Sequence, residues 1–583
     1  MIFIGRPAAL LVTLLVLGSA CARQPSAPPP PTLAGLIRSY EREVEPYYPI
    51  SASELGRRQY DRVLANDIGA EYLSGLKEIC SRYREDLRRL DAAPLPPKER
   101  LTYDVFAYRL NRCLEGFTYP WWLLPVDQVG FSWPTRFPIM GAGKGVQPFK
   151  TVKNYEDFLG RVDGFVMWMD TAVANMRAGQ TAGITLPRDL ALRVIPQLDA
   201  QIVDDPRQSL FYEPIKNFPP PFDDASKRTL EARYRQAIQE QIVPAYRRMR
   251  AFMQDEYLPR CRTTYGFEDL PGGVAWYAFA VRYSTTTDLT PDQIYEIGLA
   301  EMARISAEIS ALQAQIRVQG DPVLQQYAGV DQLLAGYISF RGEVEAALPK
   351  LFGRLPRSGF EIRAIEPYRE RSMPSSYEAP SIDGSRPGVF YLNAAEVRAG
   401  GRGIVSRTLF LHEAVPGHHL QIALQRENTS LPDFSRFSSY TAFSEGWALY
   451  AESLGDELGV YGNRRDRLEM LYAEQFRAAR LVVDVGLHHK GWTKQQAINY
   501  LGGSRENAER EVERYMAWPG QALAYKVGQL KIRGIRRKAE AALGPAFDVR
   551  AFHDEMLADG SLPLAILETK MDRWIAAQKN RRP

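Results

Sequence analysis

A chain of 583 residues, of which 45% are hydrophobic and 24% are charged, has the composition of a globular protein with a substantial core. Its formal net charge of +4 is small for this length. Lysine and arginine do not gather in blocks with interleaved aromatic residues, so the composition speaks against nucleic-acid binding and we expect no nucleic-acid partner.

Residues 1–20 are typical of an export signal. One arginine precedes the apolar stretch PAALLVTLLVLG, which is too short to span a bilayer comfortably, and small residues follow. LGSAC resembles a lipoprotein signal, in which Cys21 would be acylated and become the mature N-terminus. Because Gly18 stands where leucine is expected, ordinary cleavage after Ala20 or Ala22 stays open. We predict an exported protein, either periplasmic or held to a membrane only by a lipid anchor at Cys21.

Residues 21–33 form a proline-rich tether in this interpretation, since QPSAPPPPT favours an extended spacer. Beyond Cys21 the chain has cysteines at three scattered positions without metal-ligand spacing. Export permits a disulfide, with Cys80 and Cys113 as the favoured pair, but two buried unpaired thiols are an equal alternative.

Helical patterns dominate the chain after the tether. Residues 33–48, 71–92 and 99–117 place apolar side chains three and four apart with charged residues between them, which predicts amphipathic helices. Between 118 and 222 aromatic, proline-rich and glycine-rich stretches break this pattern, and we interpret them as long loops over a body. TPDQ at 290–293 predicts a helix start with a capping threonine, a first-turn proline and a glutamine that completes a capping box.

The segment LHEAVPGHHLQ holds three of the six histidines of the chain. His412 and Glu413 begin the H-E-x-x-H pattern, in which two histidines one helical turn apart bind zinc and the glutamate acts as base. Pro416 stands where the second histidine is expected. His418 and His419 lie about 9 and 10.5 Å along the axis of a regular helix from His412, too far to share an ion with it.

A distorted helix would remove this difficulty. Pro416 cannot donate to the carbonyl of His412, so it opens that turn, and Gly417 tolerates unusual dihedral angles. A bulge over residues 414–417 would bring His418 beside His412. The alternative is a pair of solvent-facing or core histidines on a kinked helix.

Glu445 is the expected third ligand. It lies in the apolar segment FSEGWALYAESLG, 27 positions after His418, which leaves room for a turn and a returning helix. Glu452 follows seven residues later on nearly the same helix face. Taken alone, Glu445 could equally be paired with an arginine.

Four motifs, LHEAVPGHHLQ, SEGWALYAE, VVDVGLHHKGW and RYMAWPGQALAYKVGQ, closely resemble the bacterial family known as domain of unknown function 885. The resemblance runs roughly from residue 34 to the C-terminus. Members of that family look like exported zinc-dependent peptidases of the large thermolysin-like clan, with a mostly helical body, and many are lipoproteins. The resemblance implies the same fold and chemistry for this chain.

The chain is also similar, more distantly, to thimet-type oligopeptidases and thermostable carboxypeptidases. On that comparison Gly417 and His418 take the place of the Gly-His that ends the motif there. Glu445 and Glu452 take the places of two glutamates seven residues apart. Two extra residues within the motif leave the choice between His418 and His419 open.

The resemblance directs attention to further residues. His488 is a candidate donor to the developing oxyanion, held by Asp484, with a helix-end histidine pair as the alternative. Tyr525 is a candidate phenol donor to the tetrahedral intermediate. Lys526 and Arg514 are candidates for binding a substrate carboxylate, and each has packing or a surface charge as its alternative.

The chain just ahead of the histidines predicts a short strand. Turn residues precede Val389 and Phe390, which favour β-structure. This strand could bind an extended peptide backbone by strand addition, with Tyr391 and Asn393 as substrate-binding residues.

These patterns predict a mostly α protein, with a large helical metallopeptidase-like body, a catalytic cleft and a small β-sheet beside the metal-site helix. Residues 34–583 should form one domain. It would comprise a front helical array over 34–285 and a metal-site region over 286–583, with the cleft between the array and residues 400–545.

The predicted function is a zinc-dependent hydrolase of the cell envelope, a metallopeptidase or carboxypeptidase that acts on short peptides. His412, His418 and Glu445 would hold Zn²⁺, and Glu413 would deprotonate water as general base. The alternatives are a zinc amidase on cell-wall-derived amides and a non-catalytic envelope lipoprotein that binds a partner.

Overall fold

The computed structural model describes residues 32–580 except 221, 368–369, 371–372 and 383–385. The predicted export signal and nearly all of the tether therefore lie outside the described residues. The protein is mostly helical, with two small sheets. Among the described residues, no helix combines the length and the apolar composition needed to cross a bilayer.

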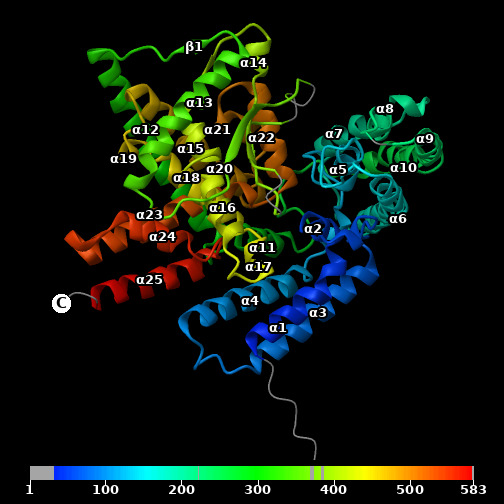
Figure 1. Cartoon of the computed structure of the whole chain (residues 1–583), viewed down its shortest axis with the longest axis horizontal. Coiled ribbons are helices and arrows are strands. Elements are labelled where there is room, and N and C mark those ends of the chain that lie inside the picture. The colour runs from blue at the N-terminus through cyan, green and yellow to red at the C-terminus, as the bar shows by residue number, and fades with distance from the viewer. Residues whose placement is uncertain (1–31, 221, 368–369, 371–372, 383–385, 581–583) are drawn as a thin grey trace, which may run out of the picture.

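The first four helices lie at one end of the molecule (Figure 1). They are α1 (Leu33–Val44), α2 (Pro49–Glu54), α3 (Ala70–Arg88) and α4 (Pro97–Gly116). A disulfide between Cys80 and Cys113 joins α3 to α4, so the favoured cysteine pair is confirmed. The buried side chains of α1, α3 and α4 belong to the same core as those of the C-terminal helices.

A side lobe follows in the chain and has a core of its own, built from residues between Leu64 and Leu258. Figure 1 shows it beside the main body. Its helices are α5 (Trp133–Gly141), α6 (Val152–Thr181), α7 (Arg188–Asp199), α8 (Glu213–Lys216), α9 (Asp224–Ala237) and α10 (Val243–Ala251). The expected front array thus divides between two cores.

The long loops expected between residues 118 and 222 were a wrong prediction over α6, which is 30 residues long. Thr151 caps this helix through a reciprocal capping box with Asn154. The buried side chains of α6, among them Phe158, Phe165 and Trp168, recur every three or four residues along one face, so the helical pattern was present in the sequence and the prediction of loops overlooked it.

The main body contains the remaining helices. They are α11 (Gly273–Thr285), α12 (Pro291–Gln319), α13 (Val330–Ala347), α14 (Ala395–Arg398), α15 (Arg407–Glu413), α16 (His418–Glu427), α17 (Asp433–Arg436), α18 (Thr441–Glu452), α19 (Gly455–Leu458), α20 (Arg464–His489), α21 (Lys494–Leu501), α22 (Arg505–Ala517), α23 (Ala524–Leu543), α24 (Val549–Leu557) and α25 (Leu564–Asn580). The predicted capping box of Thr290 and Gln293 begins α12.

Two small sheets accompany these helices. One pairs β1 (Gln326–Tyr327) with β5 (Gly403–Ile404), and the other has the order β2 (Phe360–Ala364), β4 (Gly388–Leu392), β3 (Ser376–Glu378). β4 is parallel to β2 and antiparallel to β3. The rings of Phe360 and Phe390 pack against Phe410 of α15. The predicted small sheet is therefore confirmed, and it lies beside the helix that carries His412.

Candidate metal centre

The histidine segment is two helices rather than one bulged helix. α15 ends at Glu413 and α16 begins at His418, so residues 414–417 lie outside both helices. Gly417 comes so close to the end of α15 that a Cβ there would lie 1.9 Å from the carbonyl oxygen of His412. On α18, Trp447 donates from Nε1 to the carbonyl of Pro416 at 2.8 Å. The proline–glycine break therefore places the start of α16 close against the end of α15.

This break brings His418 to His412, as predicted. Nε2 of His412 and Nε2 of His418 each lie 3.5 Å from Oε2 of Glu445 on α18. One ligand atom from each of these three residues lies within 4.8 Å of the others. Atoms that share a tetrahedral zinc ion at about 2.0–2.2 Å lie roughly 3.5 Å apart, so the group could close on an ion with small movements.

His419 points away from the group. Its Nδ1 forms a 2.8 Å hydrogen bond with the hydroxyl of Tyr377 on β3, and its ring lies 4.6 Å from that of Phe360. His418, rather than His419, is therefore the histidine that meets His412.

The charges of the group suit a cation. Burial raises the pKa of Glu445, but its contacts with His412 and His418 outweigh burial and hold that pKa well below its ordinary value. Oε2 of Glu445, which faces both imidazoles, has no hydrogen-bond partner among the described residues. Two imidazoles and one carboxylate are a donor set that zinc takes in catalytic sites. The residues present therefore fit a zinc ion.

Glu413 is a neighbour of this group. Its side chain is 8% exposed, and burial raises the pKa of its carboxyl. The charges that act on it include His412, His418 and Glu445. A carboxyl with a raised pKa is a stronger base once ionised, as proton transfer from water requires.

Glu452 binds the ring nitrogen of His412 that does not face Glu445. Its Oε1 accepts a 2.8 Å hydrogen bond from Nδ1 of His412 and lies 3.5 Å from Nη2 of Arg477. Its backbone carbonyl accepts from the hydroxyl of Tyr461 at 2.6 Å. A carboxylate on the second imidazole nitrogen fixes the ring orientation of a metal-binding histidine.

Tyr525 and Arg514, two of the predicted site residues, lie close enough for the charge of Arg514 to act on Tyr525, as that of Glu445 also does. Burial raises the pKa of the Tyr525 phenol, and the charges that act on it are Glu445, Arg480 and Arg514. Arg514 donates to Gln521 and, at 2.9 Å, to Glu511.

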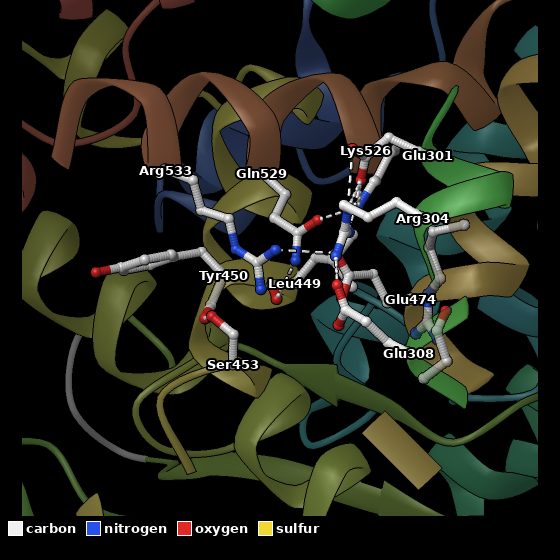
Figure 2. Close-up of polar contacts among 12 residues, drawn as sticks. Glu301, Arg304, Glu308, Leu449, Tyr450, Ser453, Glu474, Lys526, Gln529 and Arg533 are labelled. Carbon is white, nitrogen blue, oxygen red and sulfur yellow. Dashed lines mark hydrogen bonds and ion pairs between the residues drawn. The ribbon is translucent and has the colours of Figure 1, made fainter. Parts of the chain in front are cut away.

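Lys526 lies elsewhere. It is fully buried on α23 and forms ion pairs with Glu474 at 2.5 Å and Glu301 at 2.8 Å. Figure 2 shows Lys526 and Gln529 pointing together into a cluster with acidic groups of α12 and α20. Its ion pairs are with Glu301 and Glu474 inside the protein, so the structure does not bring Lys526 into the group of His412, His418 and Glu445.

The hydrogen bonds of His488 go to backbone groups and not to the candidate metal ligands. His488 is fully buried, its Nδ1 accepts from the backbone N–H of Phe267 at 3.2 Å, and its Nε2 lies 3.0 Å from the carbonyl of Tyr515. Asp484 does not hold His488 but accepts from the hydroxyl of Tyr277 at 2.7 Å and from Gly520. Both ring nitrogens of His488 are therefore used by the backbone.

β4 does not offer a peptide-binding edge, because it pairs with β2 on one side and β3 on the other. The side chain of Asn393 donates to the carbonyls of Glu370 and Met373, both at 2.7 Å, and so holds the chain before β3. Tyr391 is paired in the ladder with Arg363 and Ser376. The open edges of this sheet belong to β2 and β3.

Sequence reasoning missed two arginines of α20. Arg477 approaches Glu452, and Arg480 lies against the ring of Tyr525. Their sequence, RAARLVVDVG, contains a signal, since an arginine in an apolar helical run must find a partner inside the protein.

A cavity of about 920 Å³ lies between the ends of α4, α16, α24 and α25. None of the candidate metal ligands lines it. The cleft expected between the front array and residues 400–545 stays a prediction.

Two solved structures resemble this fold. A crystal structure of a proposed lipoprotein from Colwellia psychrerythraea is 27% identical, with a TM-score of 0.84, over 94% of this chain and 99% of the other. The structure of a proposed lipoprotein of unknown function from Shewanella oneidensis is 17% identical, with a TM-score of 0.67, over 93% and 99% of the two chains, and supports the fold alone.

The comparison with curated proteins gives no match. The model of a family of bacterial proteins of unknown function, DUF885, matches residues 49–571. Since this match spans most of the sequence, the chain belongs to the DUF885 family.

Proposed function

We propose that this protein is a zinc-dependent hydrolase that cleaves an amide bond in short peptides. The observation that carries the proposal is the meeting of His412, His418 and Glu445 with Glu413 beside them, in a chain with only six histidines. A binding site alone needs no base next to its ligands, whereas hydrolysis does.

In this proposal His412, His418 and Glu445 hold the ion. When bound, zinc supplies a Lewis acid that polarises an amide carbonyl and lowers the pKa of water. Glu413 accepts a proton from the attacking water. The same carboxyl then returns that proton to the nitrogen of the leaving amine, so the base is regenerated.

Tyr525 is the proposed donor to the oxygen that gains negative charge. Burial and the negative charge of Glu445 both raise the pKa of the Tyr525 phenol, so the phenol stays protonated at neutral pH. A fixed donor at the developing oxyanion stabilises the transition state more than the ground state. His488, with both nitrogens bound to backbone groups, has no part in this proposal.

We also propose that the protein is exported and works in the cell envelope, tethered by a lipid at Cys21. The sequence of residues 1–20 supports this, as does the Cys80–Cys113 disulfide, because disulfides persist in oxidising compartments. The Colwellia and Shewanella structures are of proposed lipoproteins.

The test is hydrolysis of a broad library of short peptides by zinc-loaded protein that begins near Thr32. Glu413→Gln should keep zinc and lose activity by about 1000-fold. Glu540→Gln is the matched control, since Glu540 pairs with Arg536 on α23. Full activity of Glu413→Gln, or no hydrolysis by the zinc-loaded protein, would contradict the proposal, and the second result would favour a binding protein.

A further inference from the structure

Arg480 on α20 contacts two aromatic rings, one on α20 and one on α23. Its guanidinium carbon lies 4.7 Å from the ring centre of Phe476 and 4.6 Å from that of Tyr525. Its Nε donates to the hydroxyl of Tyr515 at 3.1 Å, and its Nη2 donates to Glu511 at 3.2 Å. The residue is 7% exposed, so its position is fixed by packing and by these bonds.

One nitrogen of this guanidinium has no acceptor. Nη1 of Arg480 is buried without a hydrogen-bond partner among the described residues. Buried polar groups in folded proteins are almost always paired, and a charged group carries the largest penalty when it is not. An acceptor bound to such an atom would remove this penalty.

A second arginine, Arg514, shares the carboxylate partner of Arg480. Arg480 and Arg514 both donate to a single carboxylate, that of Glu511. Nη1 of Arg514 donates to the side chain of Gln521, which is neutral. Glu511 is therefore the carboxylate that forms an ion pair with both guanidinium groups, and Asp484 interacts with Arg514 through its charge alone.

This arginine cluster adjoins the proposed metal ligands. The phenol of Tyr525, whose ring contacts Arg480, is subject to the charge of Glu445. One helical turn earlier on α20, Arg477 lies 3.5 Å from Glu452, the carboxylate behind His412. α20 therefore carries both Arg477, which contacts the carboxylate behind His412, and Arg480, whose Nη1 has no partner among the described residues.

We propose that Arg480, supported by Arg514, binds a carboxylate of the substrate next to the metal site. The inference rests on the proposed function, and it narrows the substrate class to peptides that carry a carboxylate close to the bond that is cut. A planar guanidinium suits a carboxylate, which accepts two parallel hydrogen bonds. The carboxylate belongs either to the free C-terminus or to an acidic side chain.

The first experiment compares matched substrates of the zinc-loaded protein and needs no variant. A peptide that the protein cleaves is made with a free C-terminal carboxylate, with a C-terminal amide, and as the amide with glutamate after the cut. Loss of a partner for a buried charge should lower kcat/KM by about 100-fold for the neutral amide. Rescue by glutamate would assign the carboxylate to a side chain, and no rescue would assign it to the C-terminus. Equal kcat/KM for all three peptides would overturn the proposal.

The second experiment changes the arginine. In Arg480→Gln the ratio of kcat/KM for acid over amide should fall from about 100 to nearly 1. Arg193→Gln is the matched control, because Arg193 also pairs with acids of α22, Glu509 and Glu513, but from a half-exposed position on α7. An unchanged ratio in a folded Arg480→Gln protein would overturn the proposal. If circular dichroism shows that this variant does not fold, the comparison of the three substrates decides.

A binding readout separates this inference from the proposed function. Calorimetry with zinc-loaded Glu413→Gln protein measures the affinity for the acid and the amide without turnover. Preferential binding of the acid without hydrolysis by wild-type protein would refute the hydrolase and keep the carboxylate site. Hydrolysis with equal affinity for acid and amide would keep the hydrolase and refute the carboxylate site.

Discussion

Glu452 accepts a hydrogen bond from Nδ1 of His412 at 2.8 Å, which leaves Nε2 of the same ring to face Glu445. Because the carboxylate is 1% exposed, little solvent competes for this bond. The orientation of His412 therefore depends on a residue that would not itself touch the metal.

Loss of Glu452 should weaken zinc binding. We expect Glu452→Ala to reduce the affinity for zinc by about 10–100-fold, and Glu452→Gln, which keeps an acceptor but loses the charge, to have the smaller effect. Competition with a chelator measures both affinities. An unchanged affinity in Glu452→Ala would mean that the contact with His412 has no role in metal binding.

Gly417→Ala should disrupt the junction of α15 and α16. The added Cβ would lie 1.9 Å from the carbonyl oxygen of His412, so one of the two helices has to shift. We expect a loss of about 2 kcal/mol or more in the free energy of unfolding, together with loss of zinc.

Gly534→Ala is the control for that substitution. Its nearest neighbour would be a side-chain nitrogen of Arg537 at 4.0 Å, and the residue lies inside α23. Inside a helix, alanine is more stable than glycine by about 0.5–1 kcal/mol when the added methyl group meets no neighbour, so this variant should gain stability. Urea unfolding of both variants checks the pair, and tight zinc binding by a stable Gly417→Ala protein would contradict the account.

His488 should contribute to stability in a pH-dependent way. Burial lowers its pKa to about 3 in the folded protein, whereas an unfolded histidine titrates near about 6.5. Between these pH values His488 is protonated in the unfolded chain but stays neutral in the folded protein. The contribution is therefore complete above about pH 6.5 and is lost as the pH falls towards 3, by up to about 1.4 kcal/mol per pH unit.

In His488→Gln this slope should disappear, so the variant loses less stability than the wild type between pH 6.5 and pH 5. Urea unfolding at several pH values measures the difference. An identical slope in the variant, or a large loss of kcat with unchanged stability, would instead favour His488 as a donor to substrate.

The sequence predicted the metal group because its signal is local. His412, Glu413 and His418 lie within one short segment, and Glu445 stands out as an acid in an apolar run. A proline and a glycine between the histidines were enough to predict a break that closes the motif. The capping box at Thr290 was predictable for the same reason, since it depends on neighbours three residues apart.

Contacts between distant segments were not predictable in this way. Lys526 follows Tyr525 in the chain, yet the helix sends it to Glu301 and Glu474 instead of the metal group. Asn393 holds a neighbouring loop, and β4 has partners on both sides. These outcomes depend on which helix face or strand edge is covered, and that depends on tertiary packing.

The most direct test of the account is the zinc content of purified protein that begins near Thr32, measured with His418→Ala and His419→Ala side by side. We predict one zinc per chain in the wild type and none in His418→Ala. His419→Ala should also keep one zinc, because His419 bonds to Tyr377 in the wild type and does not belong to the metal group. Absence of zinc from the wild type after reconstitution, or loss of zinc in His419→Ala alone, would contradict it.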